Sequence, residues 1–174
     1  NKVAIYDSDH FCYTCVDLQW AWKTFTRGAN PIFMDHYDGK STGRGAEMAY
    51  SSSNPDTVIL RKNLGYTLQY ANKMDLISMT PQPNLSSTGN CLAKTGSEYL
   101  IYQEGSDSFS VTLTPGTYTI EWLNPSNGNI TQNGTHTATN NSSYTFKAPF
   151  NGDSVLYLKS TSTPPPTATY TQTP

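Results

Sequence analysis

Apolar and polar positions follow two different rhythms along the chain. Up to about residue 81, short apolar runs alternate with segments of helical spacing, whereas residues 82 to about 160 alternate with period two. The remaining stretch, residues 161–174, is of low complexity and rich in Pro and Thr. The pattern predicts an α/β region at 1–81, an all-β region at 82–160, and a linker or tail at 161–174, after which a further module could follow.

The α/β region contains two short apolar runs, at Val3–Tyr6 and Ile32–Met34, which are typical of buried parallel strands. Between them, apolar residues at helical spacing predict a helix from about Asp17 to Arg27, with Gly28 as its C-cap.

A second helix is expected to begin at residues 54–56, where Asn-Pro-Asp places a cap, a first-turn proline and an acid in order. Its expected apolar stripe consists of Leu60, Leu64, Leu68, Ala71 and Met74. Two strand–helix units cannot enclose a core, because parallel strands need cover on both faces. We therefore expect residues 1–81 to be the last part of a larger α/β domain.

The all-β region alternates clearly: apolar residues at 109, 111 and 113 are separated by Ser or Thr, and the same rhythm recurs near residues 118–122, 144–148 and 155–158. Turn signals such as TPGT and PFNGD separate these runs. Six or seven short strands in about eighty residues indicate a small antiparallel β-sandwich.

Charge and composition exclude several classes of protein. The formal net charge is −2 and the basic residues are scattered, which argues against nucleic-acid binding. No segment is apolar enough to span a membrane. The three cysteines, Cys12, Cys15 and Cys91, complete no zinc set, so we expect no metal and no cofactor. The chain does not begin with Met, so we expect its true N-terminus to be missing.

Four segments together resemble a known family. These are DSDH (7–10), WAWKTFTRGANPIFMDHYDG (20–39), RKNLGYTLQYANKMDLISMTP (61–81) and STGNCLAKTGSEYLIYQEG (87–105). They resemble the C-terminal part of apiosidase-like glycoside hydrolases, which are TIM-barrel enzymes of bacterial origin. In that family the barrel is often followed by a β-sandwich that is named a collagen-binding domain.

The resemblance implies the last β/α units of a partial (β/α)8 barrel followed by a small antiparallel β-sandwich. Val3–Tyr6 would be the penultimate barrel strand and Ile32–Met34 the last one. Active sites of such barrels lie at the carboxyl ends of the strands. This placement implies a catalytic face with a carbohydrate substrate, formed by Asp7, Asp9, His10, Asp35, His36 and Asp38.

Glycoside hydrolysis uses two carboxyl groups, one as an acid and the other as a nucleophile or base. By the resemblance, the penultimate strand would supply the nucleophile, which makes Asp9 the first candidate and Asp7 the second. His10, Asp35, His36 and Asp38 would contact the substrate. Related barrels usually carry Glu as the nucleophile, and no Glu precedes Glu47. The alternative is that Asp7 and Asp9 only bond loop amides or cap the next helix.

The function expected is therefore that of a C-terminal fragment of a secreted or cell-surface glycoside hydrolase, inactive by itself. The alternative is an extracellular binding or structural module, in which the sandwich binds a matrix protein or a glycan. Six aromatic residues bear on this choice, but most alternate with polar residues and so are expected in the core: Tyr99, Tyr102, Tyr118, Trp122, Tyr144 and Tyr157.

Asn-x-Ser/Thr triplets begin at Asn84, Asn129, Asn133, Asn140 and Asn141. Such triplets are frequent by chance in a chain rich in Thr and Asn, and they mean little if the source of the protein is bacterial.

Overall fold

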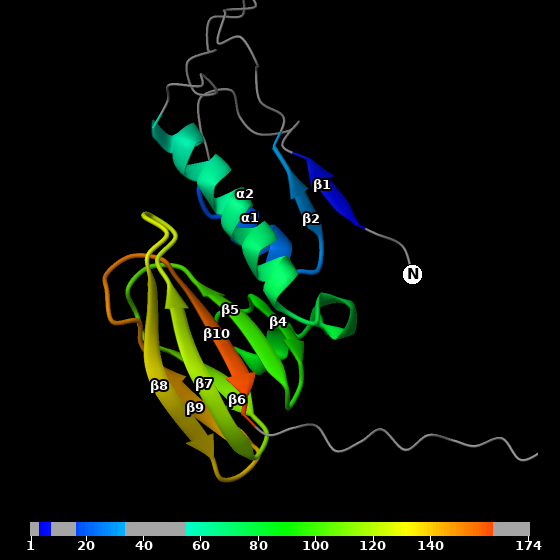
Figure 1. The fold of residues 1–174 in the computed structure, drawn as a ribbon, viewed down its shortest axis with the longest axis vertical. Helices are drawn as coiled ribbons and strands as arrows, with labels where there is room; N and C mark the ends of the chain where they lie inside the picture. The colour runs from blue at the N-terminus through cyan, green and yellow to red at the C-terminus, as the bar shows by residue number, and fades with distance from the viewer. Residues whose placement is uncertain (1–3, 8–16, 34–54, 162–174) are drawn as a thin grey trace, which may run out of the picture.

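A computed structural model describes residues 4–7, 17–33 and 55–161. Two short parallel strands and two helices form one part, and two antiparallel sheets form the other (Figure 1). Strand β1 (Ile5–Asp7) pairs with β2 (Asn30–Ile32); helix α1 (Trp20–Thr26) follows β1 in the chain, and α2 (Pro55–Lys73) follows β2.

The remaining strands form what we call the two-sheet unit, residues 80–160. Its larger sheet has six strands, in the order β3-β4-β5-β10-β7-β8, and its smaller sheet pairs β6 with β9. The strands are β3 (Thr80–Pro81), β4 (Cys91–Lys94), β5 (Glu98–Gln103), β6 (Phe109–Leu113), β7 (Gly116–Leu123), β8 (Ile130–Ala138), β9 (Ser142–Phe146) and β10 (Ser154–Ser160). Two 3₁₀ turns, η2 (Leu76–Ser78) and η3 (Pro83–Leu85), flank β3.

The six-stranded sheet is covered on both faces. Between the two sheets lies a core that includes Tyr99, Tyr118 and Trp122. A second core lies on the other face, where α1 and α2 pack through Trp22 and Tyr70 against side chains of the sheet (Figure 1). Strand β10 contributes alternate side chains to the two cores: Leu156 and Leu158 belong to the first core, and Val155 and Tyr157 belong to the second.

The period-two pattern is confirmed in β6, where Phe109, Val111 and Leu113 are buried and the residues between them are half-buried. In β7 it holds for Tyr118, Ile120 and Trp122, but Glu121 and Leu123 are buried as well. The helices cause this difference, because they cover the sheet face that the alternation would assign to solvent.

Helix α1 is shorter than expected, because the helix begins at Trp20 rather than at Asp17. The Asp17 carboxylate instead accepts a hydrogen bond from the backbone N–H of Gln19 at 2.9 Å, which makes a turn before the helix. Gly28 terminates the helix with φ +78°. A Cβ at this position would lie 2.7 Å from Pro81 Cγ, so the turn also requires glycine for its packing against β3.

The expected stripe of α2 is only partly correct. Leu60 and Met74 are buried, but Leu68 is 62% exposed. The buried side of the helix is instead formed by Thr57, Leu60, Asn63, Thr67 and Tyr70. Polar residues can occupy this side because their groups are bonded: the Thr67 hydroxyl, for example, donates to the Leu64 carbonyl at 2.8 Å.

The second strand lies two residues earlier in the chain than the sequence pattern predicts. It spans Asn30–Ile32 instead of Ile32–Met34, and residues from 34 to 54 lie outside the described part. Neither strand is buried as expected, because Ile5 and Tyr6 are 60% and 61% exposed and Ile32 is 45% exposed. Within the described residues, no further strand pairs with β1 or β2.

The two covered faces predict that the helices and the two-sheet unit unfold together. Leu100 and Ile101 are adjacent, fully buried, and belong to the helix-side core and the inter-sheet core respectively. We expect Leu100→Ala and Ile101→Ala each to lower the free energy of unfolding by about 2–5 kcal/mol.

Urea unfolding, followed by circular dichroism and by tryptophan fluorescence, measures both losses, and we expect the two probes to coincide in each variant. A near-neutral Leu100→Ala would show that the helices do not stabilise the sheet.

Candidate functional site

The expected site lies at the carboxyl ends of β1 and β2. The two strands are parallel, with Ile5 opposite Asn30, Tyr6 opposite Pro31 and Asp7 opposite Ile32. Both strand ends therefore meet at the same edge, with the exposed Asp7 at the last position of β1. Five of the six candidate site residues lie outside the described part of the chain: Asp9, His10, Asp35, His36 and Asp38. Their roles stay predictions.

The opposite ends of these strands are fixed by the backbone. The Asn30 N–H donates to the Ala4 carbonyl at 2.9 Å, next to the α1–β2 turn. That turn is closed by two further bonds, from the Gly28 N–H to the Phe25 carbonyl and from the Ala29 N–H to the Thr24 carbonyl. This double closure, with glycine at positive φ, is a common helix C-terminal motif. It sets the direction in which β2 leaves the helix.

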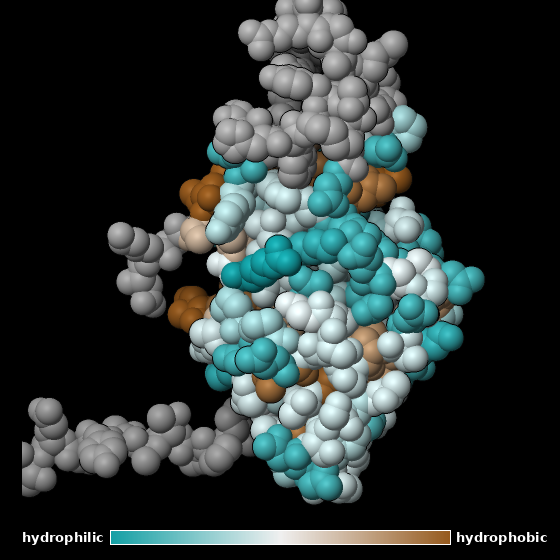
Figure 2. Space-filling model, turned by 180° about the vertical axis from the view of Figure 1, so that it is seen from behind, coloured by the Kyte–Doolittle hydropathy of each residue, from teal (hydrophilic) through white to brown (hydrophobic). Residues whose placement is uncertain are grey.

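Apolar side chains remain exposed on this strand pair and on two elements that follow it in the chain. Ile5, Tyr6 and Ile32 are exposed on the strands, as are Leu68 of α2 and Ile77 of η2, which is fully exposed. Figure 2 shows the larger hydrophobic areas in the part of the molecule that carries the helices, β1 and β2, and mostly hydrophilic or neutral surface over the two-sheet unit. Parallel strands are normally covered on both faces, so this surface is of the kind that further α/β units bury.

A buried amide joins the two helices to the two-sheet unit. The Trp22 indole N–H donates to Asn63 Oδ1 at 2.6 Å. The Asn63 Nδ2 group donates to the carbonyls of Ile59 at 2.9 Å and Pro125 at 3.1 Å. Pro125 belongs to the β7–β8 loop, so one side chain, itself 1% exposed, connects α1, α2 and that loop. We call this contact the Asn63 junction.

The same loop packs closely on α2. Gly128 has φ +77°, and a Cβ at this position would lie 2.1 Å from the Tyr66 hydroxyl oxygen and 2.5 Å from its ring carbon Cζ. The approach is possible only because Gly128 has no side chain.

An ion pair between the exposed Lys73 and the buried Glu121 connects the other end of α2 to the sheet. Lys73 Nζ lies 2.5 Å from each carboxylate oxygen of Glu121. The Tyr70 hydroxyl donates to the same carboxylate at 2.8 Å, and the Gln132 side chain also donates to it. Lys73 Nζ also lies 5.4 Å and 5.0 Å from the ring centroids of Tyr70 and Tyr157. Such cation–π contacts strengthen when the charge is partly desolvated.

The local pKa values follow from this network. Burial works to raise the pKa of Glu121, but the hydrogen bonds from Lys73, Tyr70 and Gln132 outweigh it, and the net pKa lies below its usual value. Burial, together with the hydrogen bond to Glu121, raises the pKa of Tyr70. A proton therefore stays on the Tyr70 hydroxyl, and Glu121 is held as the anion.

The aromatic side chains of the strands do not form a ligand platform. Tyr99, Tyr118 and Trp122 lie between the sheets, and Tyr102 and Tyr157 lie under the helices, which confirms the expected core positions for these five. Tyr144 is half-buried and packs against His136, with ring centroids 4.7 Å apart. Trp22 is also in the core, as its position on the helix stripe predicts.

Sequence reasoning missed Asn63 and Glu121. Asn63 interrupts the apolar spacing of α2, and this interruption was the only signal available. Glu121 alternates with buried residues, so the pattern placed it in solvent, whereas it is 6% exposed.

The described residues contain no group of three or more His, Cys, Asp or Glu side chains placed to hold a metal ion. Cys91 is a free thiol between the sheets, and burial raises its pKa to about 12. Cys12 and Cys15 lie outside the described part. None of the described helices is long and apolar enough to cross a membrane.

Comparison with models of protein families finds no match, and comparison with curated proteins finds none either. Several solved structures are similar, and two of them are glycoside hydrolase chains. One is a chain described as a glycoside hydrolase, with a TM-score of 0.60 and 14% identity over 82% of this chain and 36% of that one. The other is a glycoside hydrolase family 5 protein from Bacteroides vulgatus, with a TM-score of 0.62 and 11% identity over 82% of this chain and 35% of that one.

The fold thus resembles part of these glycoside hydrolase chains, and this chain spans about a third of their length. Identities this low show a shared fold only. The comparisons single out neither the apiosidase-like enzymes nor a collagen-binding domain.

The Gly128–Tyr66 contact can be tested against a matched glycine. Gly105 has φ +76°, nearly the same as Gly128, but its Cβ would meet no atom within 4 Å. We expect Gly105→Ala to cost about 1–2 kcal/mol from backbone strain alone, and Gly128→Ala to cost more, because it adds a clash. Urea unfolding measures both. Equal losses in the two variants would contradict the close approach of the β7–β8 loop to α2.

The Glu121 network predicts a pH dependence of stability. Because the folded pKa lies below the ordinary value of 4.5, the stabilisation is fully present above that value and is lost as the pH falls through the folded pKa. We expect Glu121→Gln to cost about 1–3 kcal/mol at pH 6, and less at pH 3.

Urea midpoints at the two pH values measure the difference between the Glu121→Gln variant and the wild type. Glu104→Gln is the control, because Glu104 pairs with Lys23 at 2.7 Å on the surface and should contribute little. A Glu121→Gln cost that does not change with pH would argue against a buried carboxylate anion.

Proposed function

We propose that this chain is the C-terminal part of an exported glycoside hydrolase that acts on a plant or microbial glycan. In this proposal β1 and β2 are the last two strands of a (β/α)8 barrel, and the two-sheet unit is an accessory β-sandwich. The observation that carries the proposal is the parallel strand pair, which is backed by helices but exposed at Ile5, Tyr6 and Ile32. The likeness to about a third of two glycoside hydrolase chains supports it.

The proposed catalytic face is the edge at which β1 and β2 end. Asp7 stands at the end of β1, and Asp9 follows two positions later in the sequence. We assign Asp9 as the nucleophile or base and Asp7 as the second candidate. His10, Asp35, His36 and Asp38 would bind sugar hydroxyls. The second catalytic carboxyl group would come from the part of the barrel outside this chain, since glycoside hydrolysis needs two.

For the accessory sandwich we favour a structural role over binding of collagen or glycan. Its larger sheet faces the helices through Leu100, Tyr102 and Tyr157, so this face is not available to a ligand. The Asn63 junction and the Lys73–Glu121 pair hold it to the helices. In the whole enzyme the sandwich would brace the two final helices of the barrel from outside.

Replacing Asp9 in the parent enzyme tests the catalytic assignment. We expect Asp9→Asn to lower kcat by at least about a hundredfold, because the amide can neither attack the sugar nor accept a proton. Initial rates on aryl glycosides and plant polysaccharides measure the effect.

Asp107→Asn is the matched control: Asp107 is an exposed carboxylate on the β5–β6 loop and should not change the rate. Wild-type activity of Asp9→Asn would remove Asp9 from the catalytic set. Robust hydrolysis by residues 1–174 alone would contradict the proposed division of the barrel.

A further inference from the structure

Strand β8 is the exposed edge of the six-stranded sheet. It is nine residues long, and among the described strands it pairs only with β7. Seven of its residues, from Ile130 through Thr135 and Thr137, are exposed. Its sequence, ITQNGTHTA, contains no Lys, Arg, Asp, Glu or Pro.

An edge strand of this kind presents unpaired backbone N–H and C=O groups, on which another chain can add a strand. Natural proteins usually protect such edges with charged residues, proline, a bulge or a covering segment. Here the register shift between Thr119 and Glu121 places a bulge in β8 at Asn133 and Gly134, which lie opposite the single residue Ile120 of β7. This device interrupts only the middle of β8, so both ends of the strand need other protection.

Four of the five Asn-x-Ser/Thr triplets lie along this edge. Asn129 immediately precedes β8, Asn133 lies at its bulge, and Asn140 and Asn141 form the turn that leads to β9. All four asparagines are exposed, as are the Ser or Thr residues two positions after them. The triplet is the acceptor for N-linked glycans in secreted proteins, where it occupies surface positions. The fifth, Asn84, lies in η3 and is also exposed.

We propose that Asn129, Asn133 and one of the adjacent pair Asn140 and Asn141 carry N-linked glycans that cover the free edge of β8. The co-substrate is a polyprenyl-pyrophosphate-linked oligosaccharide. The Asn Nδ2 atom attacks the anomeric carbon of its first sugar, forms the C–N bond and loses one proton. The bond from that carbon to the pyrophosphate oxygen breaks, and the lipid pyrophosphate leaves. No oxidation or reduction occurs.

The folded structure can accommodate these glycans. Transfer to the chain precedes folding, so an occupied asparagine must end on the surface. At Asn140 the Tyr144 hydroxyl donates to Oδ1 at 3.0 Å, which uses the amide oxygen and leaves its nitrogen available for the sugar. A flexible, hydrated glycan beside the strand would hinder the approach of a second strand without occupying the ladder itself.

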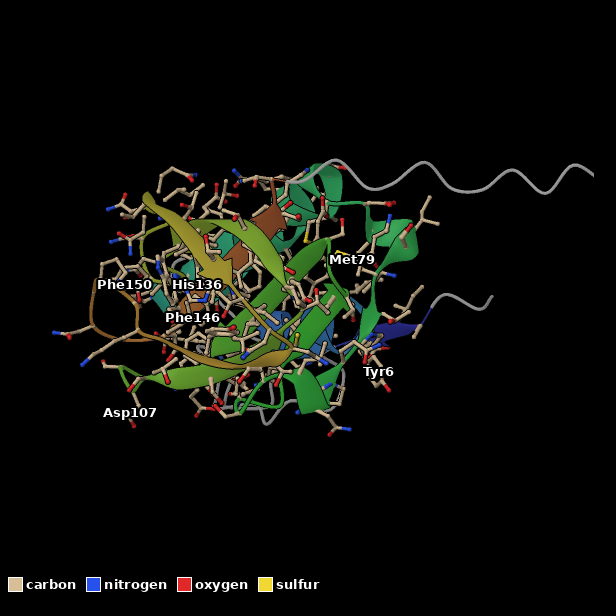
Figure 3. The ribbon with its side chains drawn as sticks, turned by 90° about the horizontal axis from the view of Figure 1, so that it is seen from below. Tyr6, Met79, Asp107, His136, Phe146 and Phe150 are labelled. Carbon is tan, nitrogen blue, oxygen red and sulfur yellow. The ribbon has the colours of Figure 1, made fainter. Side chains whose placement is uncertain are left out.

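The glycosylated flank lies away from the proposed catalytic face. Figure 1 shows β8 on the opposite side of the molecule from β1. In Figure 3 His136 of β8 and Tyr6 of β1 likewise lie on opposite sides. Glycans on β8 would therefore not obstruct substrate. The inference rests on the export that we propose for the enzyme, through a secretory pathway that attaches N-linked glycans, and it is independent of hydrolysis.

The test is secretion of the full chain, behind a cleavable signal, from yeast or animal cells. Enzymatic release of N-glycans leaves Asp at each used asparagine, and peptide mass spectrometry identifies these positions. We expect conversion at Asn129, at Asn133 and at one residue of the 140–141 pair. The single variants Asn129→Gln and Asn133→Gln should each lose the mass of one glycan.

The chain provides its own negative control. Asn124-Pro125-Ser126 has the spacing of an acceptor triplet but carries Pro in the middle, which prevents transfer, so Asn124 should stay unmodified. For a variant that is not exported, translation in the presence of microsomal membranes also shows which asparagines are glycosylated. Unmodified asparagines along β8, or modification at Asn84 alone, would overturn the proposal. The readout is mass, so it separates this failure from a failure of the hydrolase assignment.

The protective role has its own measurement. We expect the variant that combines Asn129→Gln, Asn133→Gln, Asn140→Gln and Asn141→Gln, which lacks these glycans and gains no charge, to self-associate at concentrations at which the glycosylated protein stays monomeric, as measured by light scattering. Adding Thr135→Lys to this variant should restore the monomer, because it places a charge on the edge. Monomeric behaviour of the four-Gln variant would overturn the protective role.

Discussion

The structure depends on burial of the outer face of the six-stranded sheet by two helices. That face carries Leu100, Tyr102 and Tyr157, which would otherwise be a large apolar surface in water. Trp22 and Tyr70 cover it, and their rings meet edge to face with centroids 5.9 Å apart. Because aromatic side chains bury large areas, this contact determines how the helices sit on the strands.

Polar groups within the second core specify its geometry. An apolar contact alone would allow the helices to slide or rotate on the sheet. The Asn63 amide, which meets partners on α1, α2 and the β7–β8 loop, satisfies its bonds in one arrangement only. Glu121 has the same effect at the other end of α2. A buried polar group that loses its hydrogen bonds costs more free energy than the same bonds contribute to stability when they are made. These groups therefore disfavour alternative packings of the helices on the sheet.

The sequence predicts local structure here better than it predicts contacts between distant parts. The alternation of Phe109, Val111 and Leu113 identifies β6 and its buried side, because period two follows from the pleat of a strand. The buried side of α2 was predicted less well. Spacing favours Leu64 and Leu68, but the surface that α2 meets includes the indole of Trp22, and Asn63 satisfies it.

For the candidate site, the sequence placed Asp7 correctly at the end of a strand that pairs in parallel with the next one. The sequence pattern places the next strand two residues too far along the chain, because Asn30 and Pro31 are poor strand formers. They adopt a strand conformation here through their pairing with β1. The two glycoside hydrolase chains share this fold over 82% of the chain, and at 14% and 11% identity that likeness concerns the fold alone.

Cys91 offers a way to follow how often the interior opens. Its thiol is 1% exposed between the two sheets, and only the thiolate reacts with alkylating reagents. In neutral buffer the Cys91 thiol of the folded state is neither accessible to the reagent nor ionised. The rate at which this sulfur becomes labelled without denaturant therefore reports how frequently the strands separate, and peptide mapping distinguishes it from the other two cysteines.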